Sequence, residues 1–375
     1  MHTMSSATEI APNVWLGPTP DPVLDSLAPN DEQPSRFDVM IEATDIAHMP
    51  DGKTFRILND MLAHPENAIP TIEFPSSGSI MPPTWSQVEV DGLMNTCAWI
   101  YRVTNAASES RKRKDSKVQA SSPTTDDRDS DGDSIMQDST TTQQESGKKI
   151  LIHCSDGYTE TSLLALAYYM YVNCAPVHTA WLALHISKRR NFFAYPTDVA
   201  LLTSIQPRIL QASPMYNHDI TSLTPPAPGW LSKMDGSLPS RILNYMYLGN
   251  LGHANNPELL REMGIGQVLS VGEPLSWSES EKKKWGKEKV LFVNNVQDNG
   301  LDPLTEEFER CLAFIGKSFS LSIEYTSLTD SFLFLENGRK NGTATLVHCR
   351  VGVSRSATIC IAEVMNKLGL SFPRA

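Results

Sequence analysis

The sequence contains two related segments in which a His-Cys pair follows an apolar run. The first is ILIHCSDGYTETS and the second is TLVHCRVGVSRSA, and 195 positions separate Cys154 from Cys349. A shorter pair precedes them in the same order, IAPNVWLG from residue 10 and ILNYMYLG from residue 242. An internal repeat of this length predicts that the chain folds as two copies of one structural unit.

Length and composition agree with two domains. The chain has 375 residues, more than one hydrophobic core usually covers, and 40% of them are hydrophobic, which is enough to build real cores. Residues 212–239 are rich in proline, glycine and serine and separate the two copies, so we predict a linker there. The predicted domains are therefore residues 1–211 and 240–375.

Residues 106–149 contain almost no aromatic or branched apolar side chain, so we expect a disordered insert in the first domain. This insert accounts for the greater length of the first copy. Its run RKRK resembles a nuclear localisation signal, although most short basic runs are solvent-exposed segments without that role. Its stretch DRDSDGDSIMQD imitates a calcium loop, but no amphipathic helix flanks it, so we predict no calcium site.

Strands and helices alternate in the second copy. The segments RILNYMYLG, IGQVLSVG and KVLFVNNV have strand character, whereas PELLREMG and PLTEEFERCLAFI have helical spacing. This alternation predicts an α/β fold, in which two tandem domains each have a mainly parallel central sheet flanked by helices.

Several functional classes are disfavoured by composition. The net charge of −11 argues against a nucleic-acid surface, and the longest apolar run, residues 163–172, is too short for a membrane span.

The N-terminus has no signal-peptide pattern, and the six cysteines are too sparse for a disulfide-rich protein and include no CxxC pair for a metal. His178 and His185 are expected to pack rather than bind metal. We therefore expect a cytoplasmic or nuclear protein without a metal or cofactor.

The strongest signal for chemistry lies at residues 346–358, LVHCRVGVSRSAT. An apolar strand would deliver Cys349 into a tight loop, Gly352 would permit its turn, and a helix would start after Ser354. The loop amides up to Arg355 and the helix N-terminus would together attract an anion, such as a phosphoryl group.

The same field would lower the pKa of Cys349 and make it a nucleophile at neutral pH. Arg355 lies six positions further on and could bind two phosphoryl oxygens with its planar guanidinium, which lysine could not do. The alternative is a buried structural cysteine that happens to have an arginine nearby.

This segment resembles the signature loop of the cysteine-dependent protein phosphatases, and the AT after RS resembles the dual-specificity branch. The resemblance implies hydrolysis of phosphotyrosine and phosphoserine or phosphothreonine in protein substrates through a phosphocysteine. It also implies that Ser356 assists release of the thiolate and that His348 tunes the loop. The implied phosphate-binding loop comprises Arg350, Val351, Gly352, Val353, Ser354 and Arg355.

Expulsion of the leaving oxygen requires a general acid on a separate loop. Asp298 is our choice because it follows the predicted strand KVLFVNNV, and VQDNGLDPLTEEFERCLAFI resembles the acid loop of the dual-specificity family. Asp302 is the rival, although a residue beside Pro303 can instead cap a helix.

The first copy departs from this pattern. Glu160 stands where the second copy has Arg355, and Asp156 adds another negative charge, so the loop should repel phosphate and the pKa of Cys154 should be raised. No aspartate occurs in residues 71–90, where the acid loop should lie. We therefore expect an inactive, phosphatase-like first domain.

An inactive half followed by a catalytic half resembles a two-domain dual-specificity phosphatase type found in fungi. The chain departs from that type at residues 316–337, which are either an extra loop or a translated retained intron. It also ends 26 residues after Cys349, so we expect an incomplete second domain with marginal stability and weak turnover.

Two other functions remain open. The first is a phosphoprotein-binding adaptor, or pseudophosphatase, which holds phosphorylated partners without hydrolysing them. The second is rhodanese or arsenate-reductase chemistry, which the RSAT continuation disfavours.

Overall fold

The computed structural model describes most of both predicted domains. The described residues are 6–21, 37–64, 69–79, 86–118, 147–188, 190–294, 296–299, 304–316 and 344–375, with the backbone alone for 107–118. The predicted insert at 316–337, apart from Gly316, and the calcium-like stretch lie outside them. Within the described part, no helix is both long enough and apolar enough to cross a membrane.

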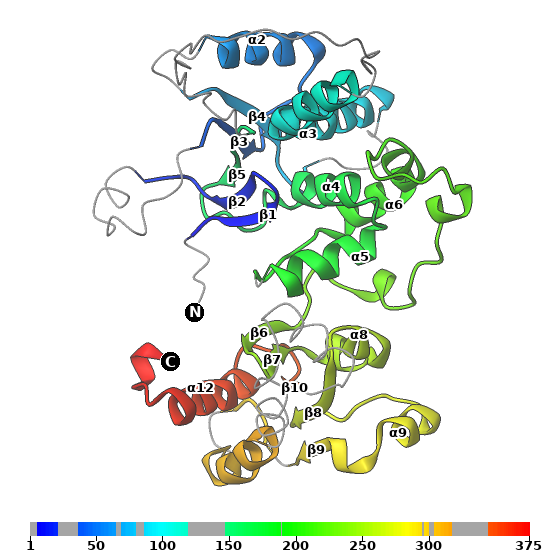
Figure 1. The fold of residues 1–375 in the computed structure, drawn as a ribbon. Coiled ribbons are helices and arrows are strands. Elements are labelled where there is room, and N and C mark those ends of the chain that lie inside the picture. The colour runs from blue at the N-terminus through cyan, green and yellow to red at the C-terminus, as the bar shows by residue number, and fades with distance from the viewer. Residues whose placement is uncertain are drawn as a thin grey trace, which may run out of the picture. The chain divides into compact units, whose positions relative to one another are not determined.

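Each copy of the repeat forms a five-stranded sheet, and the two sheets have the same strand order (Figure 1). The order is β1-β2-β5-β3-β4 in the first sheet and β6-β7-β10-β8-β9 in the second. In each sheet the first pair of strands is antiparallel and the other neighbours are parallel. The predicted mixed α/β fold with two mainly parallel sheets is therefore confirmed.

The strands of the first sheet are β1 (Thr8–Ala11), β2 (Val14–Pro18), β3 (Val39–Thr44), β4 (Thr71–Pro75) and β5 (Ile150–Cys154). Those of the second sheet are β6 (Ser240–Leu243), β7 (Met246–Gly249), β8 (Ile265–Val271), β9 (Val290–Val293) and β10 (Ala344–His348).

The helices alternate with these strands as the sequence predicts. Those that belong to the first copy are α2 (Gly52–Ala63), α3 (Gln87–Val118), α4 (Ser162–Asn173), α5 (Val177–Leu182), the π-helix η2 (Ala183–Ser187) and α6 (Pro196–Gln211). Those of the second copy are α7 (Leu251–Ala254), α8 (Pro257–Glu262), α9 (Glu279–Trp285), a helix over 308–316 and α12 (Arg355–Leu368). Short 3₁₀ turns are η3 (Ile220–Leu223), η4 (Leu231–Lys233), η5 (Lys287–Lys289), η6 (Leu304–Glu307) and η7 (Phe372–Arg374).

The strand that ends in the His-Cys pair lies at the centre of each sheet. All five residues of β5 and all five of β10 are buried, as expected for parallel strands that are covered on both faces. The carboxyl ends of β8, β9 and β10 meet at one edge of the second sheet, because these strands are parallel neighbours. The loops that follow these three strands can therefore build one site.

Helix α12 follows the loop and closes the core on one face of the second sheet. Its buried residues Ile359, Cys360 and Val364 recur at helical spacing and belong to one cluster with Phe314 and other residues of helix 308–316. The helix ends at Gly369, whose φ of 62° is the left-handed conformation that favours glycine after a helix.

The expected disorder of residues 106–149 is corrected at both ends. Helix α3 continues to Val118, and residues 147–149 lead into β5, while 119–146 lie outside the described residues. The segment SESRKRKDSK lacks apolar residues, but arginine, lysine and glutamate have good helix propensity. A helix that already exists can extend through them without a new nucleation cost.

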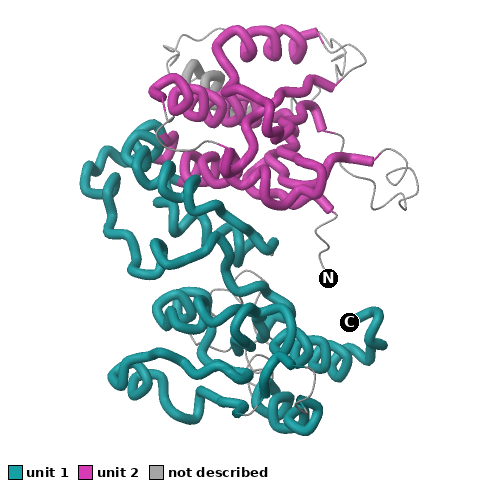
Figure 2. The backbone as a smooth tube through the Cα atoms, turned by 180° about the vertical axis from the view of Figure 1, so that it is seen from behind, with its two compact units in different colours: residues 1–2, 174–212, 216–375 teal, residues 3–173, 213–215 magenta. Residues whose placement is uncertain are grey.

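The described chain divides into two compact units (Figure 2). Residues 3–173 and 213–215, magenta in Figure 2, are called the first unit below because they come first in the chain. Residues 174–212 and 216–375, teal in Figure 2, are called the second unit. The division therefore falls before α5, and the predicted limits at 211 and 240 stay a prediction.

Most of the segment predicted as a linker, residues 216–239, belongs to the second unit. The ring of Trp230 lies 6.1 Å from that of Trp181, and the Nε2 of His185 lies 2.9 Å from the carbonyl oxygen of Pro239. Although the segment is rich in proline and glycine, a few of its apolar side chains are buried, such as those of Trp230 and Leu238, and they hold it against the rest of the unit.

Candidate active site

The site lies where β10 ends and α12 begins, in the loop of residues 349–354. Gly352 adopts a φ of +88°, and a Cβ atom there would lie 2.7 Å from the carbonyl oxygen of Gly249. Glycine is therefore required both by the backbone conformation and by the close approach of β7. The structure has the strand, tight loop and helix start that the sequence predicts.

The loop surrounds the sulfur of Cys349 with hydrogen-bond donors. Cys349 is 1% exposed, and its Sγ accepts bonds from the Gly352 amide at 3.3 Å and the Ser356 hydroxyl at 3.1 Å. Burial on its own raises the pKa of the thiol, but bonds from Ser356 and from the amides of Gly352 and Ser354 outweigh it. The pKa of Cys349 is consequently lowered from its ordinary value.

Arg355 is held from two sides while one of its donors stays unoccupied. The residue is 8% exposed, its Nη1 donates to the Val296 carbonyl at 3.0 Å, and its Nη2 donates to Glu273 Oε1 at 3.1 Å. Its buried Nε has no partner among the described residues. Because a buried unpaired donor is unfavourable, this N–H marks a place for an external acceptor such as a phosphoryl oxygen.

Glu273 is a residue of the site that the sequence analysis missed. It follows β8 and pairs with Arg355, while a Cβ at the preceding Gly272 would lie 2.1 Å from Arg355 Nη1. The signal was available, since a charged residue directly after a predicted parallel strand lies at the same sheet edge as Cys349.

We expect Glu273→Ala to lower kcat/KM about 10- to 100-fold, because Arg355 loses the contact that fixes its guanidinium plane. Glu273→Gln should recover part of the loss, since an amide oxygen still accepts a bond from Nη2. Steady-state kinetics of both variants, with the exposed Glu309→Ala as a control, checks this. Equal kinetics for the Ala variant and the unchanged chain would contradict it.

His348 is buried beside Cys349 and connects the loop to the sheet. Its Nε2 lies 2.6 Å from the Ser270 hydroxyl on β8, and its Nδ1 lies 3.2 Å from the Cys349 carbonyl oxygen. Burial lowers the pKa of His348 to about 4, so the ring is neutral at pH 7. A neutral ring can donate to the carbonyl from Nδ1 and accept the Ser270 proton at Nε2.

Asp298 lies at the rim of the same loop. Its Oδ1 accepts a hydrogen bond from the Ser354 hydroxyl at 2.7 Å, and the residue is exposed. The bond from Arg355 to Val296 attaches the same segment to the loop a second time. The rival acid, Asp302, lies outside the described residues.

In the corresponding loop of the first unit, carboxylates lie beside the cysteine, whereas the second unit has the guanidinium of Arg355. The Cys154 thiol donates to Glu160 Oε2 at 3.0 Å and to Asp156 Oδ1 at 3.4 Å. Burial, followed by the bond to Glu160, raises the pKa of Cys154 to about 12. The two carboxylates therefore lie where a phosphoryl group would have to bind, and the thiol stays protonated at neutral pH.

Serines follow β4, where an acid loop would begin in the first unit. The Ser77 hydroxyl donates to the Glu160 carbonyl and accepts from the Leu163 amide, so it holds the degenerate loop.

His178 and His185, which the sequence analysis considered as possible metal ligands, lie outside this loop. Both ring nitrogens of His185 contact backbone groups, and burial lowers the pKa of His178 as well as that of His185.

Residues 246–375 match the family described as the catalytic domain of the dual specificity phosphatases. This domain therefore resembles the catalytic domain of a dual-specificity phosphatase. The chain is also 30% identical over 292 residues to dual specificity protein phosphatase PPS1 of Saccharomyces cerevisiae, a match that covers 58% of this chain and 33% of that protein.

Two further relatives match over about the length of the phosphatase domain. Dual specificity protein phosphatase 1 of Arabidopsis thaliana is 28% identical over 141 residues, which is 38% of this chain and 58% of that protein. Human dual specificity protein phosphatase 16 is 30% identical over 138 residues, which is 36% of this chain and 17% of that protein. The chain thus spans less than two thirds of the length of each of these relatives.

Proposed function

We propose that this chain hydrolyses phosphotyrosine and phosphoserine or phosphothreonine in proteins through a phosphocysteine at Cys349. The observation that carries the proposal is the buried, unpartnered Nε of Arg355 in the loop that surrounds a thiol of lowered pKa. One guest satisfies both features, because a phosphoryl group offers oxygens to the guanidinium and an electrophilic phosphorus to the sulfur.

In the first step, the Cys349 thiolate attacks phosphorus and the bond to the leaving oxygen breaks. Asp298 gives its proton to that oxygen, so that a neutral alcohol or phenol departs. Arg355 and the loop amides balance the charge on the transferring phosphoryl oxygens. The bond from Ser354 to Asp298 supports this role, because it holds the carboxyl group at the rim of the loop.

In the second step, water attacks the phosphocysteine and the sulfur–phosphorus bond breaks. Asp298, now ionised, accepts the water proton and is restored as an acid. The sulfur leaves as a thiolate, which the Ser356 hydroxyl stabilises from the 3.1 Å position that it already occupies. Inorganic phosphate is the product.

The first unit is proposed to be a phosphatase-like domain without activity, as in a two-domain enzyme. The common strand order of the two sheets supports the tandem relationship, as does a yeast match longer than residues 246–375. The carboxylates of Asp156 and Glu160 beside Cys154 support the loss of the reaction. A cytoplasmic or nuclear location, without nucleic acid or membrane as partner, stays a prediction.

Hydrolysis of a panel of phosphotyrosine, phosphoserine and phosphothreonine peptides tests the proposal. Asp298→Asn should lower kcat about 10²-fold or more for peptides, because the leaving oxygen loses its proton donor. For a substrate whose leaving group is an acidic phenol, the kcat of Asp298→Asn should fall much less, because that phenol leaves as a phenolate and needs no proton.

Cys349→Ser is the reference without a nucleophile. It should lose turnover and retain phosphopeptides, whereas an adaptor would bind the same peptides in both forms and hydrolyse none. An Asp298→Asn variant that is as active as the unchanged chain on every peptide would remove Asp298 from the mechanism.

A further inference from the structure

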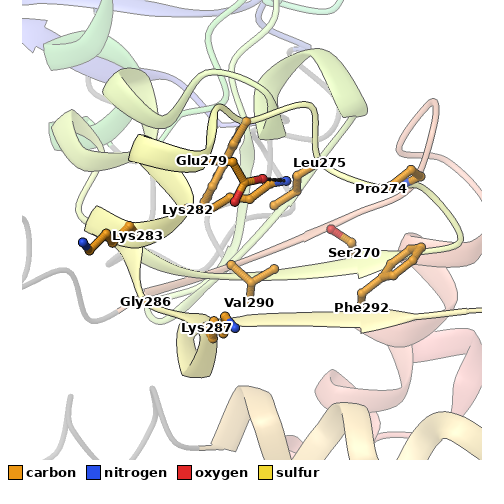
Figure 3. Close-up of a pocket in the computed structure, with 11 residues that line it drawn as sticks. Ser270, Pro274, Leu275, Glu279, Lys282, Lys283, Gly286, Lys287, Val290 and Phe292 are labelled. Carbon is orange, nitrogen blue, oxygen red and sulfur yellow. Dashed lines mark hydrogen bonds and ion pairs between the residues drawn. The ribbon is translucent and has the colours of Figure 1, made fainter.

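A cavity lies in the second unit, and none of its lining residues is a reacting group in the proposed mechanism (Figure 3). Its volume is about 620 Å³, and its walls come from β8, β9, η5, α9 and the segment between β8 and α9. Apolar side chains line much of it, namely Leu275, Trp277, Val290 and Phe292. The volume is that of a small-molecule pocket rather than of a single water site.

The charged residues that line the cavity are mostly of one sign. Glu279 forms an ion pair with Lys282 at 2.8 Å, as the dashed line in Figure 3 shows. Lys283 and Lys287 also line the cavity, and neither side chain forms an ion pair or hydrogen bond within the part of the chain that the structure describes. The charge of Lys287 does help to lower the pKa of Glu279. The lining thus carries three lysines against one glutamate beside an apolar wall, in a chain whose net charge is −11.

The lining offers few polar groups to anything else. Its one serine, Ser270, already uses its hydroxyl in the bond to His348. A peptide backbone bound here would lose water from amide groups without gaining partners, which is unfavourable. A molecule with one anionic head and an apolar body leaves no polar group unpaired in this cavity.

The cavity shares part of its wall with the supports of the active site. Ser270 holds His348, and Pro274 and Leu275 directly follow Glu273, which holds Arg355. A molecule in the cavity would therefore contact Ser270, which holds His348, and the two residues that follow Glu273, which holds Arg355.

We propose that this cavity binds a small amphiphilic carboxylate, with its head at Lys283 and Lys287 and its chain against Val290 and Phe292. The bound molecule displaces the segment after β8 and thereby lowers turnover at Cys349. The second statement rests on the proposed phosphatase function, whereas the first is tested by binding alone.

Calorimetric titration of the full chain with dodecanoate below its micellar concentration tests the binding. We expect one site, and a Kd raised at least tenfold in Lys283→Glu and in Lys287→Glu. Lys284→Glu and Lys289→Glu introduce the same charge change in the same segment at residues that do not line the cavity, and should shift the Kd less than twofold. Equal effects in the two pairs would overturn the site.

Two further comparisons separate the cavity from unspecific adsorption. Dodecan-1-ol lacks the charge and should bind at least tenfold more weakly than dodecanoate. Val290→Trp fills the cavity and should abolish binding of both, with circular dichroism as the check on folding. Equal binding of the acid and the alcohol, or unchanged binding in a folded Val290→Trp variant, would also overturn the site.

Turnover of para-nitrophenyl phosphate at saturating dodecanoate tests the effect on activity. We expect a fall in kcat of at least twofold in the unchanged chain and none in Val290→Trp. Unchanged kcat at saturation would overturn the regulatory statement. A chain with no turnover even without dodecanoate would count against the phosphatase proposal, and the calorimetric result would still decide the binding site.

Discussion

Iodoacetate at pH 7 is expected to alkylate Cys349 at least about 10³-fold faster than Cys154, although both are buried cysteines that follow a histidine. The reason is the thiolate fraction, because the thiolate is the nucleophile. A pKa of about 12 leaves roughly 10⁻⁵ of Cys154 ionised at pH 7, whereas an ordinary thiol is about 3% ionised. Cys349 should exceed the ordinary thiol, because its pKa is lowered.

The alkylation rate rises with pH at both positions, but over different pH ranges. As the pH falls from 9 to 6, alkylation of Cys349 should decline only when the pH passes its lowered pKa, later than for a free thiol. Alkylation of Cys154 should keep rising up to the most alkaline pH tested. Mass spectrometry of the two cysteine-containing peptides measures both rates in one sample. Similar rates, or no protection of Cys349 by orthovanadate, would contradict the anion site.

Arg355→Lys is expected to lower kcat/KM about 10³-fold while the domain still folds. Lysine keeps the positive charge, but it cannot donate to Val296, Glu273 and a phosphoryl oxygen from one rigid plane. The loss is of the size seen when one preorganised donor to a transition state is removed. The observed geometry therefore predicts a large effect from a substitution that conserves charge.

Steady-state kinetics and thermal unfolding of the same preparation check this prediction. Arg310→Lys is the matched control, because Arg310 lies on the outer side of helix 308–316 and pairs with Glu307. Its kinetics should match those of the unchanged chain. A kcat/KM for Arg355→Lys within tenfold of the control would show that charge alone suffices, and the fork of donors would then have no special role.

The sequence was informative where one short segment determines both a conformation and a chemistry. An apolar run, a cysteine, a glycine and a helix start predict the loop, because each residue acts on its near neighbours. The repeat likewise predicted two sheets, and the same strand order occurs in both. The raised pKa of Cys154 followed from the acid that stands in place of the arginine.

The sequence was less informative where partners come from distant strands. The contacts of Glu273 with Arg355 and of Ser270 with His348 join positions that are 82 and 78 residues apart. No local pattern pairs such residues, and only the order of the strands brings them together. Composition also failed for α3 and for residues 212–239, because a few helix formers or a few buried aromatic rings outweigh an average over a whole segment.

The matching architecture of the two units has a consequence for how oxyanions titrate this chain. Each unit presents a loop after its central strand, yet carboxylates occupy the loop of the first unit while the second offers an unoccupied Nε. Tungstate or vanadate should therefore saturate at one equivalent per polypeptide rather than two. The number of oxyanions bound per polypeptide would then measure the fraction of chains in which the loop at Cys349 is correctly folded, because the loop at Cys154 is expected to bind none.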